Sequence, residues 1–390
     1  MDVERARREI AASLGDRFPP RTRTSAATVL GAGNDDLAPG RAWLAALAPG
    51  GWSVPGWPAD HGGRGATPQD VAVVARELAA YEQPDLYPFL IGLHVVGPTL
   101  LTLASDGQQA RWLRPIASGE EIWCQLFSEP GAGSDLANVA TRAERDGDMW
   151  RLTGQKVWSS RAHYAKWGFC LARTDVDVPK HAGITAFAVD MTADGVDVRP
   201  LRQMNGDAHF SEVFLDDVLV PDGDRIADVG SGWPVARTAL ANERGAVGAA
   251  GAGLGSPTER LVDLARSVHP DPVHVDRVVC AHLEAEVARL TMRRARDAAR
   301  AGTPGPEGSG AKLRGSRILK ESADAALALL GAEALTDAVG EWATLFLTAP
   351  SISIRGGTDE IQRNIVGERV LGLPPEPRVD ADRPYRDVPH

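Results

Sequence analysis

Three short stretches of the chain carry residues that could bind a ligand. The first, CQLFSEPGAGSD at residues 124–135, places Ser128 and Ser134 beside Gly131 and Gly133. Glycine lets the backbone approach a ligand closely, and the two hydroxyls lie beside N–H groups that can also donate hydrogen bonds. No helix signal follows the loop, so the pattern differs from a phosphate site at a helix N-terminus. A tight β-turn with polar residues explains this loop equally well.

The second stretch, GQKVWSS at residues 154–160, carries Trp158 next to Ser159 and Ser160. An indole ring can stack on a flat cofactor ring while neighbouring hydroxyls bond to the edge of that ring. A tryptophan in a strand is, however, more commonly a core residue. Together the first two stretches favour a planar heterocyclic ligand.

The third stretch, SISIRGGTDEIQRN at residues 351–364, contains a Gly-Gly-Thr turn at 356–358 before a predicted helix. Asp359 and Glu360 fall in the first turn of that helix, where negative charge interacts favourably with the helix dipole. An ordinary capped helix also accounts for these residues without any ligand.

The composition restricts the kinds of partner. The 390 residues include 42 Lys and Arg against 52 Asp and Glu, a formal charge of -10, which argues against a nucleic-acid partner. Cys124, Cys170 and Cys280 are far apart and show no CxxC spacing, which predicts reduced thiols. His269 and His274 lie in one proline-containing loop with no third ligand apparent, so we predict no metal site.

Two segments bear on location. The N-terminal segment MDVERARREI lacks the apolar core of a signal peptide, and we therefore expect a cytoplasmic protein. Residues 86–104 contain no charge over about the length that a bilayer requires, but prolines and glycines interrupt them. We expect two buried helices that meet at a bend, and no membrane association.

The periodicity of apolar residues changes twice along the chain. Residues 1–121 show a helical pattern, residues 122–222 alternate with a period of two, and residues 223–390 are helical again. Asp146-Gly147 is a hairpin signal within the middle part. The sequence thus predicts an N-terminal helical domain, a compact antiparallel β domain and a C-terminal helical domain.

The three stretches, in this order and at these separations, closely resemble the acyl-CoA dehydrogenase family of flavoproteins. The likeness extends from GWSVPGWPADHGGRG to ERVLGLP and so covers most of the chain. It implies an α+β multidomain fold with an N-terminal helical domain, a middle antiparallel β-barrel-like domain and a C-terminal four-helix bundle. It also implies FAD between domains and subunits, and a homo-oligomer, either a tetramer or a dimer.

The resemblance also assigns residues to the site. In the family pattern Ser128 lies beside the reactive flavin nitrogen, and Ser134 contacts the pantetheine of the acyl thioester or the cofactor phosphates. The implied FAD contacts are Gln125, Phe127, Ser128, Gly133, Ser134, Trp158, Ser160, Thr358 and Glu360. The implied substrate contacts are Ser134, Asn242, Arg244 and Gly357.

The family reaction needs a base, because a proton leaves the carbon alpha to a thioester carbonyl while hydride passes from the beta carbon to flavin N5. A carboxylate in a desolvated pocket suits this step, since burial raises its proton affinity. Many members carry a glutamate immediately before the Gly-Thr turn, where this chain has Gly356. Isovaleryl- and long-chain-type members carry it on a helix of small residues, and the matching residue in ALANERGAVGAAG is Glu243. The resemblance predicts Glu243 as the base; an ion pair or a helix-surface charge is the alternative.

Arg355 departs from the family pattern, which has a small residue before the Gly-Gly pair. A guanidinium near the pocket could pair with Glu243 and lower its pKa, or it could recognise a carboxylate on an unusual substrate. The family's Arg-x-x-Phe-Gly stretch, which contacts FAD from the neighbouring subunit, is not recognisable, and Arg277 is the nearest candidate for that role.

Three functions are compatible with these features. The first is FAD-dependent α,β-dehydrogenation of an acyl-CoA or acyl-carrier thioester in fatty acid or lipid metabolism, with electron-transfer flavoprotein or a similar acceptor. Gly356, which lacks the carboxylate, favours a flavin-dependent monooxygenase of the same fold as one alternative. A non-catalytic subunit of a heteromeric acyl-CoA dehydrogenase is the other, because the FAD contact around Arg277 is uncertain.

Overall fold

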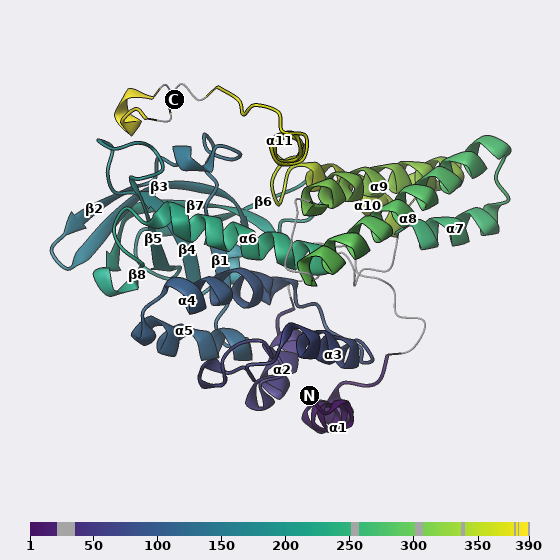
Figure 1. The fold of residues 1–390 in the computed structure, drawn as a ribbon, viewed down its shortest axis with the longest axis horizontal. Coiled ribbons are helices and arrows are strands. Elements are labelled where there is room, and N and C mark those ends of the chain that lie inside the picture. Colours follow the sequence, from purple (N-terminus) through teal and green to yellow (C-terminus); the bar gives the residue numbers. More distant parts are fainter. Residues whose placement is uncertain are drawn as a thin grey trace.

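The computed structural model describes residues 1–21, 36–250, 257–300, 307–336, 340–377, 380 and 382–388. Helices come first along the chain, a β-sheet follows, and helices return. Figure 1 shows the sheet with the first helices beneath it and the last helices extending to one side. The predicted order of helical, β and helical parts is confirmed.

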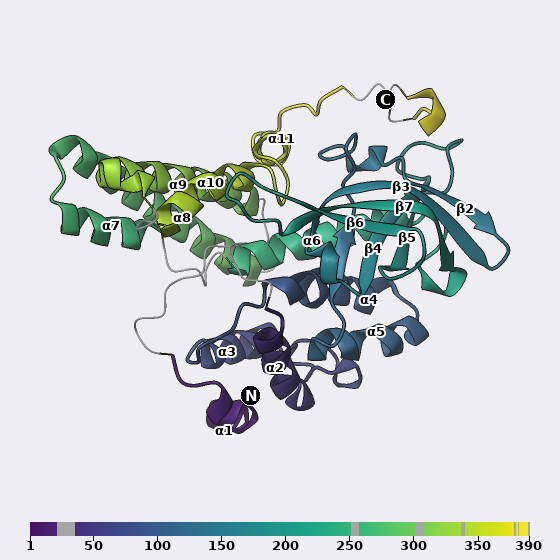
Figure 2. The same cartoon turned by 180° about the vertical axis from the view of Figure 1, so that it is seen from behind.

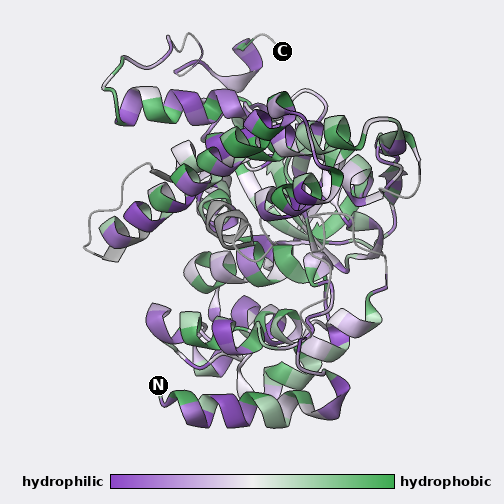
Figure 3. Ribbon diagram, turned by 90° about the vertical axis from the view of Figure 1, so that its right-hand side faces the viewer, coloured by the Kyte–Doolittle hydropathy of each residue, from purple (hydrophilic) through white to green (hydrophobic). Residues whose placement is uncertain are grey.

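The described residues of the N-terminal part form five α-helices, and three of these begin at a capping side chain. Asp2 accepts a hydrogen bond from the backbone N–H of Arg5, and Ser105 and Gln108 form a capping box. In Figure 3, hydrophobic and hydrophilic residues alternate along the helix beside the N-terminal label, as expected for a helix with one face packed on the core. The helices are α1 (Val3–Leu14), α2 (Ala38–Leu47), α3 (Pro68–Leu78), α4 (Gly97–Leu103) and α5 (Asp106–Ser118).

The uncharged residues 86–104 form one nearly continuous helical segment. A 3-10 turn, η4 (Tyr87–Phe89), is followed by a π-helix, η5 (Ile91–Val96), which leads directly into α4. In place of the predicted bend between two helices, the segment changes its helix type. Pro98 fits into this segment because it lies in the first turn of α4, where a proline breaks no helical hydrogen bond. Within the described residues, no helix combines the length and the apolar character needed to cross a bilayer.

The middle part is one sheet with the strand order β6-β7-β3-β2-β4-β5-β8, and β1 pairs with β4. The predicted hairpin at Asp146-Gly147 is confirmed, since Asp146 pairs with Met149 across an antiparallel turn. Most pairings are antiparallel, as predicted, but β1 and β2 each pair with β4 in parallel. The strands are β1 (Trp123–Leu126), β2 (Arg142–Asp146), β3 (Met149–Ser160), β4 (Trp167–Arg173), β5 (Ile184–Asp190), β6 (Val196–Leu201), β7 (Phe210–Pro221) and β8 (Arg225–Ile226).

The first helix of the C-terminal part, α6 (Gly232–Ala250), lies between the sheet and the N-terminal helices. It contacts β4 and β5 on one side and η5 and α4 on the other, and Figures 1 and 2 both show it in this position. The remaining helices gather around α9, which contacts each of the others. They are α7 (Pro257–Val268), α8 (Pro272–Arg300), α9 (Glu307–Leu330), α10 (Gly340–Thr348) and α11 (Asp359–Arg369).

The end of the chain returns to the β domain. Pro384 forms an isolated bridge with Pro179, and the backbone N–H of Tyr385 donates to Val178 O at 2.9 Å. Figure 1 shows this segment above the sheet, on the side opposite the N-terminal helices. Residues from the two ends of the chain therefore cover different faces of the β domain.

Candidate functional site

The first two of the three candidate ligand-binding stretches lie side by side on the sheet. The backbone N–H of Val157 donates to Ser128 O at 2.9 Å, so the loop after β1 is joined to the end of β3. Lys156, fully buried, donates to Glu129 Oε1 at 2.7 Å, and also to Leu171 O at 2.6 Å. The two stretches therefore form one structural unit, although they are separated in the sequence.

Glu129 is a buried residue whose carboxylate bonds to the backbone next to the loop. Its carboxylate accepts hydrogen bonds from the backbone N–H groups of Ala140 (2.6 Å) and Thr141 (3.0 Å). Burial acts to raise the pKa of Glu129, but the charge of Lys156 and the hydrogen bonds outweigh burial and hold the pKa below its ordinary value. The carboxylate thus stays ionised and fixes the backbone of the loop, in which Gly133 and Ser134 are exposed.

Lys156 and Glu129 are important residues that the sequence analysis did not single out. The sequence did contain a signal for Lys156: side chains of a strand alternate between its two faces, which places Lys156 on the same face of β3 as the buried residues Trp150 and Leu152. A lysine at an inward position needs a buried partner. The partner could not be chosen from the sequence, since Glu129 lies 27 residues away.

Trp158 has the conformation and exposure expected of a ligand-contacting residue. Its φ is 60°, in the left-handed region that bulky residues rarely adopt, and 60% of its surface is exposed. The ring meets Phe210 edge to face, with centroids 6.0 Å apart. The alternative that Trp158 is a core residue is wrong, and its neighbour Ser160 is half-buried beside it.

Phe127 and Ser128 occupy different environments at the end of β1. Phe127 is 3% exposed and packs on Phe169, with ring centroids 5.3 Å apart, so its side chain belongs to the core. Any contact of Phe127 with a cofactor would therefore be through its backbone. Ser128 is half-buried at the surface of the loop.

Glu243 lies on α6 and faces β1. Gln125 Nε2 donates to Glu243 Oε2 at 3.5 Å, and both side chains are half-buried. The neighbouring Asn242 donates from Nδ2 to Thr99 Oγ1 of α4 at 3.2 Å. The predicted base and the predicted flavin contact Gln125 are thus brought together, while the side chain of Arg244 lies outside the described residues.

The Gly-Gly-Thr turn caps α11. Thr358 Oγ1 accepts from the backbone N–H of Ile361 at 3.2 Å, which is the usual bond of an N-cap threonine. Gly357 has a φ of +86°, and a Cβ there would lie 2.6 Å from Gln362 Nε2. Glu360 is exposed and forms an ion pair with Arg363 at 3.0 Å. The backbone of this turn therefore requires glycine for its conformation.

Arg355 lies close to Tyr87 of the N-terminal domain. Burial lowers the pKa of the Arg355 guanidinium, whereas its interaction with Tyr87 of η4 acts to raise the pKa. Arg161, which is 2% exposed, lies with its Cζ 5.3 Å from the centre of the Tyr87 ring. The sequence analysis singled out Arg355 but not Arg161 or Tyr87, whose meeting depends on the domain arrangement.

Arg277 takes part in an ion pair within the helical bundle. It lies at the start of α8 and pairs with Asp324 of α9. This partner of Arg277 is therefore in the same domain. The role of Arg277 toward FAD stays a prediction.

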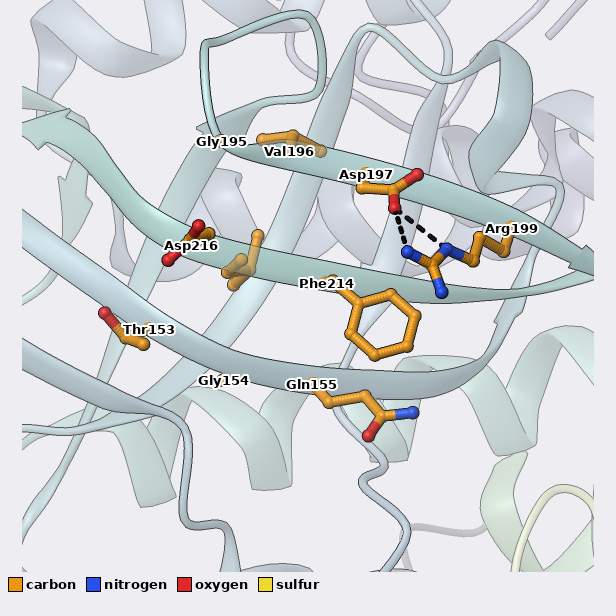
Figure 4. Close-up of a pocket in the computed structure, with 10 residues that line it drawn as sticks. Thr153, Gly154, Gln155, Gly195, Val196, Asp197, Arg199, Phe214 and Asp216 are labelled. Carbon is orange, nitrogen blue, oxygen red and sulfur yellow. Dashed lines mark hydrogen bonds and ion pairs between the residues drawn. The ribbon is translucent and has the colours of Figure 1, made fainter.

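A separate hollow lies on the sheet and contains none of the predicted site residues. Figure 4 shows its ion pair, in which Arg199 Nη2 lies 2.6 Å from Asp197 Oδ2. Arg199 also lies over the ring of Phe214. The residues that line it are Thr153, Gly154, Gln155, Gly195, Val196, Asp197, Arg199, Phe214, Leu215 and Asp216.

Sequence profiles of one family match all three parts of the chain. The profiles of the acyl-CoA dehydrogenase N-terminal, middle and C-terminal domains match residues 25–120, 124–218 and 230–371. The chain therefore belongs to the acyl-CoA dehydrogenase family, whose members are FAD-dependent oxidoreductases.

Individual proteins that are similar to this chain are also acyl-CoA dehydrogenases. The chain is 45% identical over 332 residues to acyl-CoA dehydrogenase FadE34 of Mycobacterium tuberculosis, a match that covers 84% of this chain and 46% of FadE34. The chain thus spans about half the length of that relative. It is 39% identical over 344 residues to acyl-CoA dehydrogenase IpdE1 of the same organism, covering 86% of this chain and 88% of IpdE1.

Solved structures with the same fold include two at slightly more than a quarter identity. The steroid ACAD Tcur3481-Tcur3483 has a TM-score of 0.76 and 26% identity, over 96% of this chain and 94% of that chain. The ChsE4-ChsE5 complex from Mycobacterium tuberculosis has a TM-score of 0.73 and 27% identity, over 95% of this chain and 96% of that chain.

The residues on the sheet suit a flavin. Trp158 presents an exposed ring at a positive φ, which is a costly conformation for a side chain with no task at the surface. Ser128 and Ser160 place hydroxyl groups in the two stretches beside that ring. A planar heterocycle with polar edges fits this combination of an aromatic surface and hydrogen-bonding groups.

Proposed function

We propose that the chain catalyses FAD-dependent α,β-dehydrogenation of an acyl-CoA or carrier-bound acyl thioester. Bound FAD supplies the acceptor for the hydride that leaves the beta carbon. Trp158 would pack against the flavin ring, while Ser128 and Ser160 would bond to its polar edge. Thr358 and Glu360 approach the same cofactor from the start of α11. Electron-transfer flavoprotein or a similar protein would be the acceptor of the electrons.

Glu243 takes the alpha proton in this proposal. The observation that carries it is the 3.5 Å contact between Gln125 Nε2 and Glu243 Oε2, because β1 leads from Gln125 directly into the Ser128 loop. The contact keeps the carboxylate on the side of α6 that faces this loop. A positioned general base typically contributes about 10²- to 10⁴-fold to the rate.

The family's other position for the base is not available in this chain. Gly356 has no carboxylate, and its φ of +67° disfavours any side chain there. Ser134 and the backbone of Gly357 are assigned to the thioester. Asn242 and Arg244 lie on α6 next to the proposed base and are assigned to the coenzyme side of the substrate.

The decisive experiment is anaerobic mixing of the FAD-loaded protein with a panel of straight, branched, cyclic and steroid-linked acyl thioesters. Flavin bleaching is the expected result, and Glu243→Gln should slow it at least about 100-fold while FAD stays bound. Glu144→Gln, which changes an exposed carboxylate on β2, is the matched control. Normal bleaching by the Glu243→Gln variant would show that another group is the base. Oxygen uptake with supplied flavin reductase, and no reaction with thioesters, would indicate the monooxygenase.

A role as one subunit of a heteromer is the second candidate. Two observations favour it: this chain matches 46% of FadE34, and a similar solved structure is the ChsE4-ChsE5 complex. Retention of FAD by the purified chain alone would favour the homo-oligomer. FAD retention only after co-expression with a homologous chain would favour the heteromer.

Apolar residues on α8 support assembly into an oligomer. They recur at intervals of four or three, so they lie along one face of the helix, and all are exposed in the single chain. A monomer rarely exposes such a contiguous apolar surface to water. This α8 stripe consists of Val275, Val279, Leu283, Val287 and Leu290.

A further inference from the structure

Arg355 has buried nitrogen atoms with no hydrogen-bond partner among the described residues. Nε and Nη2 are both shielded from solvent, although a guanidinium carries five N–H donors in a planar fork. Buried donors of a charged group are normally satisfied, because loss of water without a replacement is costly. These two donors of Arg355 therefore indicate an acceptor that the described residues do not supply.

The surroundings of Arg355 are cationic and aromatic. Tyr87 lies close enough to Arg355 to raise the pKa of its guanidinium, and Arg161 Cζ lies 5.3 Å from the centre of the Tyr87 ring. Arg161 Nη1 donates to Tyr164 OH at 2.6 Å, and the His209 ring meets Tyr87 edge to face with centroids 6.2 Å apart. Two guanidinium groups thus interact with Tyr87, and two neighbouring positive charges favour a bound anion.

Arg355, Arg161 and Tyr87, here called the arginine cluster, are linked to the proposed base through shared helices and strands. Tyr87 begins the helical segment that continues through η5 into α4, and both helices contact α6, which carries Glu243. On the other side, η7 (Ala162–Tyr164) follows Arg161 and contacts β1, which carries Gln125. The cluster and Glu243 therefore border the same strand and the same helical segment.

We propose that Arg355, with Tyr87 and Arg161, forms a subsite for a carboxylate at the end of the acyl group remote from the thioester. This inference rests on the proposed function, because it assigns one end of the same substrate. The planar fork of a guanidinium matches the two oxygens of a carboxylate better than an ammonium group does. A methyl-ended acyl chain would leave the buried donors unsatisfied, so the subsite selects against it.

The test compares two matched series of coenzyme A derivatives on the FAD-loaded protein. One series carries a terminal carboxylate and the other a terminal methyl group, over the same range of chain lengths. Binding is measured by calorimetry with thioether analogues, which lack the thioester carbonyl and cannot be dehydrogenated. Turnover is measured separately with the thioesters by flavin bleaching.

We expect the wild-type protein to bind a carboxylate-ended analogue more tightly than its methyl-ended counterpart. Arg355→Met should weaken the carboxylate-ended analogue at least about 100-fold and the methyl-ended one less than about threefold. The affinity of Arg355→Lys for the carboxylate-ended analogue should lie between those of the wild type and Arg355→Met, since lysine keeps the charge and loses the planar fork. Arg199→Met, which changes an exposed arginine on the sheet, should alter neither.

Equal binding of the two series by the wild-type protein would overturn the subsite. So would an equal loss for both series in Arg355→Met together with an altered flavin absorption spectrum, which would show that Arg355 contacts the flavin. If the carboxylate preference holds but no thioester bleaches the flavin, the subsite stands and the proposed dehydrogenation fails. The binding and bleaching measurements therefore separate the two proposals.

Discussion

Lys156 Nζ donates a 2.7 Å hydrogen bond to Glu129 Oε1, and neither side chain is more than 8% exposed. Glu129 belongs to the loop after β1, and Lys156 precedes Trp158 on β3. The pair therefore fixes the loop that carries Ser128 relative to the exposed indole ring. A buried ion pair of this kind contributes little net stability, but losing one partner is strongly destabilising.

Lys156→Met should lower the free energy of unfolding by about 3–5 kcal/mol, because it leaves a buried carboxylate without its cation. The measurement is urea denaturation of the apoprotein. Lys166→Met is the control, since Lys166 pairs with Asp190 at the surface and its loss should cost at most about 1 kcal/mol. Equal effects of the two variants would show that Lys156 is not an essential partner of Glu129.

The Glu129 carboxylate should also give the fold a specific pH dependence. Its pKa is lower in the folded protein than in the unfolded chain, so its stabilisation is complete above the unfolded pKa of about 4.3. The stabilisation is lost as the pH falls through the lower, folded pKa. The difference in unfolding free energy between wild type and Glu129→Gln should be constant above about pH 6 and narrow below about pH 4. A difference that widens toward low pH would contradict this assignment.

Trp158→Ala should weaken FAD binding about tenfold or more while changing the unfolding free energy of the apoprotein by less than about 0.5 kcal/mol. The reason is that 60% of the Trp158 surface is exposed, so few packing contacts are lost within the chain itself. Fluorescence titration with FAD and urea denaturation provide the two readouts. Leu219→Ala changes another exposed apolar residue, on β7, and should leave FAD affinity unchanged.

The α8 stripe should mediate assembly. Val279→Glu combined with Leu283→Glu should reduce the molar mass in solution, because two carboxylates would have to be buried in the contact between chains. Light scattering coupled to size-exclusion chromatography measures this mass. Val268→Glu, which changes an exposed valine on α7, is the control. An unchanged mass for the double variant would place the contact on another surface.

The order of the three parts and the sheet hairpin could be predicted because they depend on local periodicity and turn residues. The N-cap at Thr358 was predictable for the same reason. Contacts between distant segments were not, and Arg355 with Tyr87 is an example: the two residues are 268 positions apart and meet only when the N-terminal and C-terminal domains are in place. Trp158 shows a third case, in which the alternating pattern indicated a strand but a left-handed φ turned the ring outward.

Residues near the C-terminus tie down the loop that carries Ser134. Lys180 Nζ lies 2.7 Å from Asp135 Oδ2 and 2.5 Å from Asp380 Oδ2, so one ammonium group joins the loop to the end of the chain. Close by, the guanidinium of Arg173 lies 3.8 Å from the centre of the Tyr385 ring. The same Arg173 donates to Ala137 O at 2.6 Å and thus braces the residues that follow the loop.

Lys180→Met should therefore release the loop without unfolding the β domain. Amide hydrogen exchange in residues 131–138 should become faster by about tenfold or more, because opening of this segment no longer breaks the ion pairs to Asp135 and Asp380. Exchange in β4 should stay slow, since that strand is fully buried. Lys166→Met again provides a surface control. If residues 131–138 exchange at the wild-type rate in Lys180→Met, backbone contacts alone hold the loop. Faster exchange accompanied by weaker binding of acyl thioesters would link the C-terminal residues to the substrate contact assigned to Ser134.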